Sequence, residues 1–253
     1  MGPQVGAARE GPRYLAGRLM LVLAVETSTP QTSVALGTEQ GVLASVSLSW
    51  ARGHSEIVVP AIHRIMEWSE IELGQVGGVA VGLGPGLFTG LRVGVSTVRA
   101  LAQVLGAPIV GFGSLDVVAF SVRHSSRRIG AVIDGKRGEV FYAFYRPVPG
   151  GVTRESVFSV GPPERLAAEL EASREETLLV GNGALLYQRD LAKTGTSLDF
   201  ASVSHAFPLA VSLLELALPR FHREEASRPQ EVVPYYVRRS DAEINWAKRA
   251  RSA

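Results

Sequence analysis

The sequence contains no cysteine, and this absence removes several chemistries at once. Without thiols there can be no disulfide framework, no thiolate nucleophile and no cysteine zinc site. What remains is a chain of 253 residues, of which 46% are hydrophobic. That length and composition can bury one large core or two modest ones and do not indicate wholesale disorder. We therefore expect a globular protein.

Long hydrophobic runs are also lacking. The most apolar long stretch, residues 76–95, is interrupted by seven glycines, Pro85 and Arg92, which makes it a poor membrane span. Residues 1–19 contain three arginines but no apolar segment of a secretory signal. We expect a soluble, cytoplasmic protein whose fold begins at Met20, with residues 1–19 a disordered extension or the product of an upstream start codon. The net charge of +2 is only a weak indication of an anionic partner such as RNA.

The first part of the chain, residues 20–123, has the pattern of a sheet with helices packed on it. Three β-rich runs separated by short turns predict an antiparallel meander, at residues 20–26, 32–37 and 42–48. The pattern then predicts a helix, a buried strand, a second helix, a parallel-type strand and a short helix, at residues 55–68, 77–83, 89–105, 108–112 and 114–122. Ser55 and Thr89 are the expected caps of the two longer helices.

A basic, polar break at residues 124–128 marks the expected subdomain boundary. Beyond it the pattern predicts two strands at 129–134 and 139–145, a helix at 163–172, a strand at 177–180, and helices at 184–191 and 208–221. Residues 124–222 therefore read as a smaller C-terminal α/β subdomain, and residues 223–253 as a C-terminal segment with a basic tail. We expect that tail to be solvated, with RNA contact as the alternative. The element order is similar to that of the actin-like ATPase (ASKHA, ribonuclease H-like) fold.

Two turns are candidates for holding phosphate. The turn between the first two predicted strands is rich in hydroxyls, whose O–H groups and backbone amides can donate to phosphate oxygens; a plain hydroxyl-rich turn is the alternative. A glycine-rich turn after the buried strand lets backbone approach an anion at a helix N-terminus, but it is neither a Walker A motif nor a dinucleotide fingerprint. The candidate residues are Thr27, Ser28, Thr32, Ser33, Gly84 and Gly86.

Several stretches together resemble the TsaB (YeaZ) family. They are residues 25–36, 53–60, 81–94, 134–141 and 234–238, and the most specific is the run Gly-Pro-Gly-Leu-Phe-Thr-Gly-Leu-Arg that starts at Gly84. The resemblance runs from Met20 to Arg239, although residues 146–227 carry little of it. It implies an actin-like fold in which the first phosphate hairpin begins with an aspartate. Glu26 stands at that place in this chain, which disfavours tight binding of a metal–nucleotide complex.

The resemblance also implies a function and partners. The family's subunit pairs with the transferase TsaD as a heterodimer, is joined by the ATPase TsaE, self-associates when alone, and meets tRNA through the complex. TsaD transfers threonylcarbamoyl to N6 of the tRNA adenosine beside the anticodon. For this chain the resemblance implies a non-catalytic scaffold and activator with no cofactor of its own, no membrane partner, and ATP or ADP possible at the complex interface.

The two longer predicted helices are the expected partner surface, because their apolar faces are wider than one sheet needs. The interface candidates are Ile57, Ala61, Ile65, Trp68, Leu91, Arg92, Val95, Val98 and Ala102. Small residues at Gly90, Gly94 and Ala102 would let a partner helix approach closely. Packing of the two helices within the chain is the alternative interpretation.

Catalytic chemistry is poorly represented. The related transferase TsaD uses a His-x-x-x-His pair on the helix that follows the second parallel strand, and residues 113–119 of this chain contain no histidine. We therefore expect no metal site, and Asp116 is expected to face solvent. His54-Ser55-Glu56 reads as a helix start. Asp134 is expected to shape a hairpin; alternatively it is the base of a stand-alone actin-fold ATPase or phosphotransferase.

Overall fold

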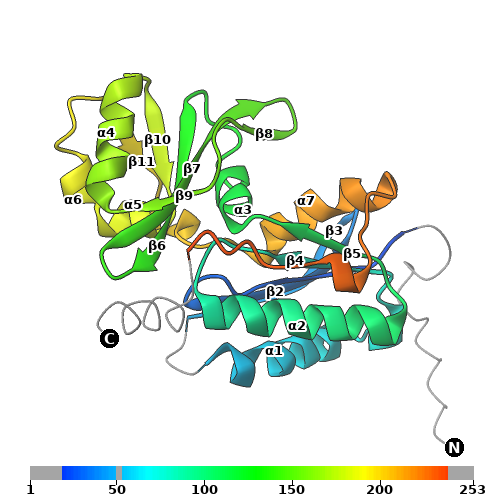
Figure 1. Ribbon diagram of the computed structural model, residues 1–253. Coiled ribbons are helices and arrows are strands. Elements are labelled where there is room, and N and C mark those ends of the chain that lie inside the picture. Colours follow the sequence, from blue (N-terminus) through cyan, green and yellow to red (C-terminus); the bar gives the residue numbers. More distant parts are fainter. Residues whose placement is uncertain (1–18, 50–52, 239–253) are drawn as a thin grey trace, which may run out of the picture.

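The computed structural model describes residues 19–49 and 53–238, which form two sheets with helices packed on them (Figure 1). The first sheet has the order β3-β2-β1-β4-β5. Its strands are β1 (Val22–Glu26), β2 (Gln31–Thr38), β3 (Gly41–Ser49), β4 (Gly78–Gly82) and β5 (Ile109–Phe112). The first three are antiparallel, and β4 and β5 run parallel to β1. This arrangement confirms the predicted meander and the actin-like α/β class.

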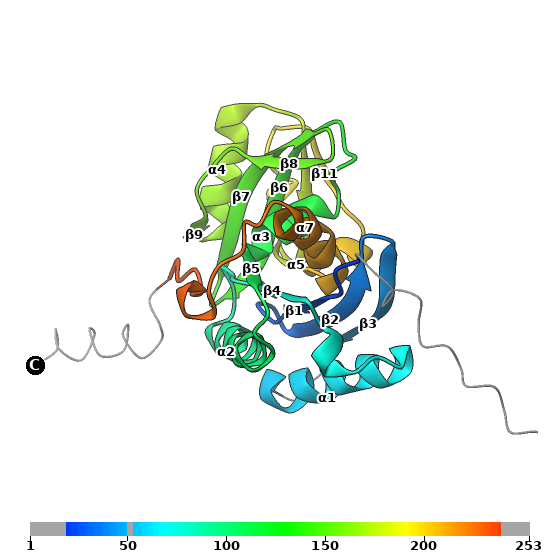
Figure 2. The same ribbon diagram turned by 90° about the vertical axis from the view of Figure 1, so that its right-hand side faces the viewer.

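Helices cover both faces of the first sheet. On one face α1 (His54–Ser69) and α2 (Phe88–Leu105) lie side by side, as Figures 1 and 2 show. On the other face lies α7 (Ala210–His222), with the short helix α3 (Ser114–Phe120) next to it. Alternate residues of β1 serve the two sides: Leu23 packs with α1 and α2, whereas Val22 packs with α7. A strand covered on both faces carries apolar residues on both of them rather than on alternate positions. Residues 22–25 of β1 are accordingly all apolar.

The second sheet has the order β11-β10-β6-β7-β8, with β9 paired to β7. Its strands are β6 (Arg128–Lys136), β7 (Glu139–Val148), β8 (Gly151–Arg154), β9 (Ser159–Gly161), β10 (Thr177–Val180) and β11 (Leu198–Phe200). Helix α4 (Pro163–Ser173) packs on it. The prediction of one helix over residues 184–191 is wrong: α5 (Asn182–Leu186) and α6 (Gln188–Leu191) are separate, because Tyr187 between them leaves helical geometry at φ −104° and ψ 18°.

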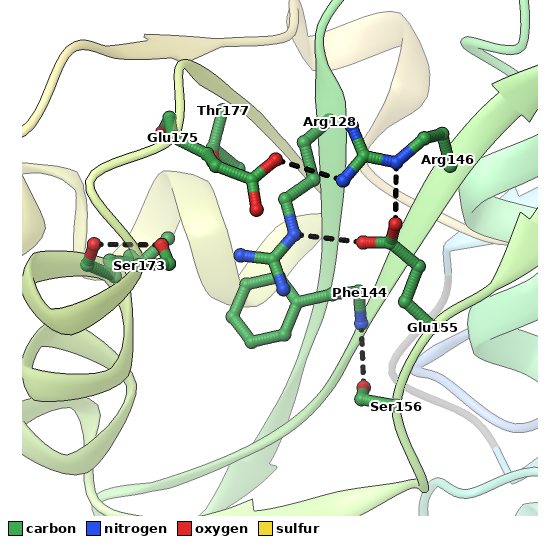
Figure 3. A network of polar contacts seen from close by, with 9 residues as sticks. Arg128, Phe144, Arg146, Glu155, Ser156, Ser173, Glu175 and Thr177 are labelled. Atoms are coloured by element: carbon green, nitrogen blue, oxygen red, sulfur yellow. Dashed lines mark hydrogen bonds and ion pairs between the residues drawn. The ribbon is translucent and has the colours of Figure 1, made fainter.

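An ion-pair network links neighbouring segments of the chain on the second sheet (Figure 3). Glu155 bridges two arginines, accepting from Arg128 Nε at 3.0 Å and from Arg146 Nε at 2.5 Å. Arg146 also donates to Glu175 Oε2 at 2.9 Å, and the Arg128 guanidinium lies 4.0 Å from the centroid of the Phe144 ring. The network therefore connects β6, β7 and the segments that precede β9 and β10.

The chain returns to the first sheet after completing the second. Helix α7, which lies within the range predicted for the C-terminal subdomain, packs against β1, β2 and β4. The segment 232–238 then crosses both parts: the Tyr235 N–H donates to Leu83 O at 2.7 Å, and Arg238 Nη1 donates to Gly135 O and Glu139 Oε2, both at 2.8 Å. The predicted extension at 1–19, apart from residue 19, and the basic tail beyond Arg238 lie outside the described residues.

Candidate functional site

The turn between β1 and β2 is buried, and its first residue is a buried carboxyl group. Glu26 is fully buried; its Oε1 accepts from the Ser28 N–H at 2.6 Å and its Oε2 accepts from Ser114 Oγ at 2.9 Å. Burial raises the pKa of Glu26, and the hydrogen bonds from Ser28 and Ser114 only partly oppose that rise. A buried carboxyl group with a raised pKa therefore stands where the actin-like fold has an aspartate.

Most hydroxyls of this hairpin are engaged inside the protein. The bonds are Thr27 Oγ1 to Gly90 O (2.8 Å), Thr32 Oγ1 with His54 Nδ1 (2.7 Å), Ser33 Oγ with Ser47 Oγ (2.8 Å), and Ala210 N–H to Ser33 Oγ (2.9 Å). The hydroxyls of Ser28 and Thr29 are buried without a partner. All five side chains are at most 1% exposed, so the candidate phosphate donors Thr27, Ser28, Thr32 and Ser33 do not face solvent.

The glycine run places α2 directly on this hairpin. A Cβ atom added at Gly86 would overlap the Ser28 carbonyl oxygen, one at Gly90 the Thr27 carbonyl oxygen, and one at Gly94 the Thr27 hydroxyl. The Leu87 N–H also donates to Ser28 O at 2.7 Å. Close approach therefore requires glycine here, but the neighbour is a hairpin of the same chain. The expectation that Gly90 and Gly94 admit a partner helix is corrected accordingly.

The residues present do not fit a nucleotide bound at this hairpin in the way the fold implies. Both carboxyl oxygens of Glu26 already accept hydrogen bonds inside the protein, from the Ser28 N–H and from Ser114 Oγ, so neither is free for the metal ion that accompanies phosphates. The turn that carries Gly86 and Leu87 lies against Ser28, where it covers the hairpin. Gly84 is buried, and Gly86 is the one phosphate candidate that lines the neighbouring pocket.

That pocket has a volume of about 490 Å³ and lies between three segments. They are the turn and first helical turn of α2, the tip of the β6–β7 hairpin, and the C-terminal segment. The lining residues are His54, Pro85, Gly86, Leu87, Phe88, Thr89, Gly90, Leu91, Lys136, Arg137, Phe141, Tyr235, Tyr236, Val237 and Arg238. The pocket thus combines basic and aromatic side chains from α2, from the β6–β7 hairpin and from the C-terminal segment.

The β6–β7 hairpin has an unusual tip. Asp134 Oδ1 accepts from the Lys136 N–H at 2.8 Å, and its Oδ2 accepts from Lys136 Nζ at 2.7 Å. These bonds agree with the prediction that Asp134 shapes the hairpin. Lys136 and Arg137 have φ values of 63° and 59°, a left-handed backbone conformation that non-glycine residues seldom adopt.

Asp116 is half-buried, with its side chain 26% exposed and bonded within the chain, rather than simply facing solvent as predicted. Its Oδ1 accepts from Tyr145 Oη at 2.9 Å, its Oδ2 accepts from the Gly113 N–H at 3.2 Å, and Arg154 Nη1 lies 3.4 Å away. Burial raises the pKa of Asp116, while Arg154 and the two hydrogen bonds lower it. The carboxylate joins α3 to β7 and β8.

The predicted interface residues divide into two groups. Six are buried in the chain's own core: Ala61, Ile65, Leu91, Val95, Val98 and Ala102. Trp68 is 62% exposed, Arg92 is exposed and Ile57 is half-buried. The prediction omitted Val59 and Val104, which are 59% and 82% exposed on the same two helices. Both belong to the wide apolar arcs that the periodicity of the two helices predicts, so that signal already included them.

The helix starts also differ from expectation. The cap positions are Gly53 for α1 and Leu87 for α2, and neither makes a side-chain capping bond. Ser55 and Thr89 are therefore not caps. Burial lowers the pKa of His54, whose ring packs against the first turn of α2. Within residues 19–49 and 53–238, no three histidine, aspartate or glutamate side chains come together as a possible metal site.

Several known proteins similar to the chain are named for tRNA threonylcarbamoyladenosine biosynthesis. The family described as "TsaD: tRNA N6-adenosine threonylcarbamoyltransferase" matches residues 41–246. The "tRNA threonylcarbamoyladenosine biosynthesis protein TsaB" of Escherichia coli is 30% identical over 90% of the chain and 98% of its own length, and that of Bacillus subtilis is 28% identical over the same shares. A solved Pseudomonas aeruginosa structure described as similar to peptidase YeaZ superposes with a TM-score of 0.75 at 28% identity, covering 87% of the chain and all of that structure. In the described part of the chain, no helix is long and apolar enough to cross a membrane.

Proposed function

This chain belongs to the TsaB (YeaZ) family and to tRNA threonylcarbamoyladenosine biosynthesis, and we propose that within this pathway it is the non-catalytic partner subunit of the transferase TsaD. In this proposal the chain is a scaffold and activator, TsaD modifies N6 of the adenosine beside the anticodon, and TsaE joins the pair. The chain meets tRNA through the complex and forms a homodimer when TsaD is absent.

The observation that carries the proposal is the outer face of α1 and α2. The inner sides of both helices are filled by the core of the first sheet, yet Val59, Trp68 and Val104 remain exposed on their outer sides. Figure 2 shows the two helices adjacent at the edge of the molecule, with no other described element outside them. Large apolar side chains exposed on neighbouring helices, together with polar residues such as Arg92, are typical of a protein–protein interface.

The state of the polar groups supports the non-catalytic part of the proposal. Glu26 is buried and bonded to Ser28 and Ser114, Thr27 and Thr32 are engaged within the chain, and the Asp134 carboxylate is held by Lys136. Phosphoryl transfer depends on groups that are free to hold the metal ion and the phosphates. We therefore assign no cofactor to the chain alone and place ATP or ADP, if required, at the interface of the complex.

A charge on the exposed helix face tests the pairing. The full-length chain and the TsaD of the same organism are co-expressed and separated on a sizing column, with Val104→Asp and Val203→Asp as matched variants. Val104 and Val203 are 82% and 80% exposed, so both substitutions spare the core. We expect Val104→Asp to weaken pairing at least tenfold, because burying an unpaired carboxylate in an interface is costly, and Val203→Asp to pair normally. Wild-type proteins that elute separately would overturn the proposal.

Activity measurements test the non-catalytic role. Modification of a tRNA transcript by reconstituted components should require this chain, and the purified chain alone should turn over no ATP. If the chain hydrolyses ATP and Asp134→Asn abolishes that hydrolysis, the alternative of a stand-alone ATPase is correct. If tRNA modification proceeds equally well without the chain, the proposed activating role is wrong.

A further inference from the structure

The described lining of the pocket beside α2 is basic. It includes Lys136, Arg137 and Arg238, and no aspartate or glutamate is among the described residues that line the pocket. Asp134 and Glu139, which are not among the lining residues, pair with Lys136 and Arg238. Because burial lowers the pKa of His54, its imidazole adds a neutral polar group rather than a charge. The described lining therefore contains three basic side chains, two of them paired with carboxylates of residues outside the lining, and no carboxylate of its own.

Two of these basic residues have a backbone conformation that is unfavourable in free energy. Lys136 and Arg137 both have positive φ, where a residue with a Cβ atom is less stable than glycine by about 1 kcal/mol. Glycine or asparagine would form this turn more easily. Strained residues cluster at ligand-binding sites, and here the strained positions carry long basic side chains at the edge of a pocket.

The facing wall supplies backbone donors. Helix α2 is 18 residues long, its cap residue Leu87 makes no side-chain bond, and its first turn contains no acidic residue. The first amides of the helix, at Phe88, Thr89 and Gly90, belong to residues that line the pocket and have no partner within the helix. Uncapped amides opposite lysine and arginine make an anion site.

We propose that this pocket binds a phosphate group directly, without a metal ion, and that the phosphate belongs to an RNA backbone. Magnesium ions at nucleotide sites are usually held through one or two carboxylates, which the described lining lacks. A phosphodiester carries a single charge and is held by lysine, arginine and backbone amides alone. Tyr236 is 50% exposed beside Phe88, with ring centroids 5.3 Å apart, and it offers a face on which an unpaired base stacks. The RNA source rests on the proposed function, whereas phosphate binding does not.

Inorganic phosphate tests the site itself. It is titrated into the ¹⁵N-labelled full-length chain while amide chemical shifts are followed. We expect saturable shifts at Phe88, Thr89 and Gly90 and at the β6–β7 tip, which Arg137→Asn reduces. The matched control is Arg174→Asn: Arg174 is also exposed, also has a left-handed backbone at φ 52°, and lies outside the pocket. Asparagine accepts that conformation, so both variants should fold. The proposal is overturned if shifts are absent, are not saturable, or are reduced equally by Arg174→Asn.

Unmodified tRNA and AMP test the source of the phosphate. With fluorescent tRNA and the full-length chain paired with TsaD, we expect Lys136→Asn/Arg137→Asn to weaken binding about tenfold or more. The slope of log affinity against log salt should fall by about 0.7 to 0.9 for each phosphate that the variant no longer neutralises. Arg174→Asn should match wild type. Unchanged tRNA affinity in a pair that still forms overturns the RNA source and leaves the proposed pairing intact. A site that takes AMP but gives no tRNA effect assigns the phosphate to a nucleotide instead.

Discussion

Alanine at Gly94 tests whether the glycine run exists to seat α2 on the β1–β2 hairpin. In an exposed helix, alanine in place of glycine stabilises by about 1 kcal/mol. At Gly94, however, the new Cβ atom would overlap the hydroxyl of Thr27, and overpacking of this kind costs about 3 kcal/mol. The free energy of unfolding should therefore fall by about 2 kcal/mol in Gly94→Ala.

A second substitution should rescue the first. Thr27→Ala alone removes the bond to the Gly90 carbonyl and a buried methyl group, a loss of about 2 kcal/mol. In Thr27→Ala/Gly94→Ala the overlapping oxygen is gone and only the Thr27 Cβ remains, 3.3 Å from the added atom. The double variant should then be about 1 kcal/mol less stable than wild type, because the helix gain of about 1 kcal/mol is recovered. The coupling energy is about 3 kcal/mol.

Urea unfolding followed by circular dichroism measures all four proteins. Gly90→Ala is the internal comparison: its Cβ atom would overlap the backbone oxygen of Thr27, which Thr27→Ala leaves in place, so no rescue is expected. Gly74→Ala is the neutral control, since a Cβ atom there would meet nothing within 4 Å. If Gly94→Ala is stabilised, or if the effects of the two substitutions simply add, the glycine run does not serve this contact.

Two titrations test the polar groups. Because burial raises the pKa of Glu26, the folded chain keeps a proton that the unfolded chain releases. The free energy of unfolding should therefore fall as the pH rises from about 4.5 through the raised pKa. Urea unfolding of Glu26→Gln over the same pH range should lack this slope, and a wild-type slope in the variant would contradict the assignment. Burial, with the bond to Glu169 Oε1 at 2.6 Å, raises the pKa of Tyr142 to about 12; the ultraviolet difference between wild type and Tyr142→Phe should show that ionisation, and Glu169→Gln should lower its pKa, whereas titration near 10 would refute the contact.

The sequence predicted the first sheet well because its signals are local. The strands of the meander are separated by short turns, and β4, β5 and α2 are each bounded by glycine or proline. Short strands gave no such signal: β8, β9 and β11 have three or four residues each, too few for an alternating pattern. Tyr187 carries no helix-breaking chemistry of its own, so the division between α5 and α6 depends on tertiary packing.

The site was harder to predict because its contacts span long separations. Asp116 looked solvent-facing, yet its partners Tyr145 and Arg154 are 29 and 38 residues further along the chain. The wide apolar faces of α1 and α2 were recognised, but periodicity cannot tell which part of the arc faces the chain's own sheet. For that reason buried Ile65 was placed at the interface and exposed Val104 was not. The glycine run was found as a motif, whereas its neighbour, Thr27, is known only from the fold.

The return of α7 to the first sheet has a mechanical consequence. The second sheet is an insertion, since the chain enters it after α3 and leaves it before α7. Both of these flanking helices contribute side chains to a core cluster shared with strands of the first sheet. Two connecting segments of the chain join the inserted sheet to the first sheet. They restrict its rotation to an axis through both connections, whereas a single terminal linker would leave that rotation unrestricted. The contacts of Tyr235 and Arg238 add a third point away from that axis. The two parts of the chain around the pocket are therefore joined at three points, of which the C-terminal segment is the one that forms no strand of either sheet.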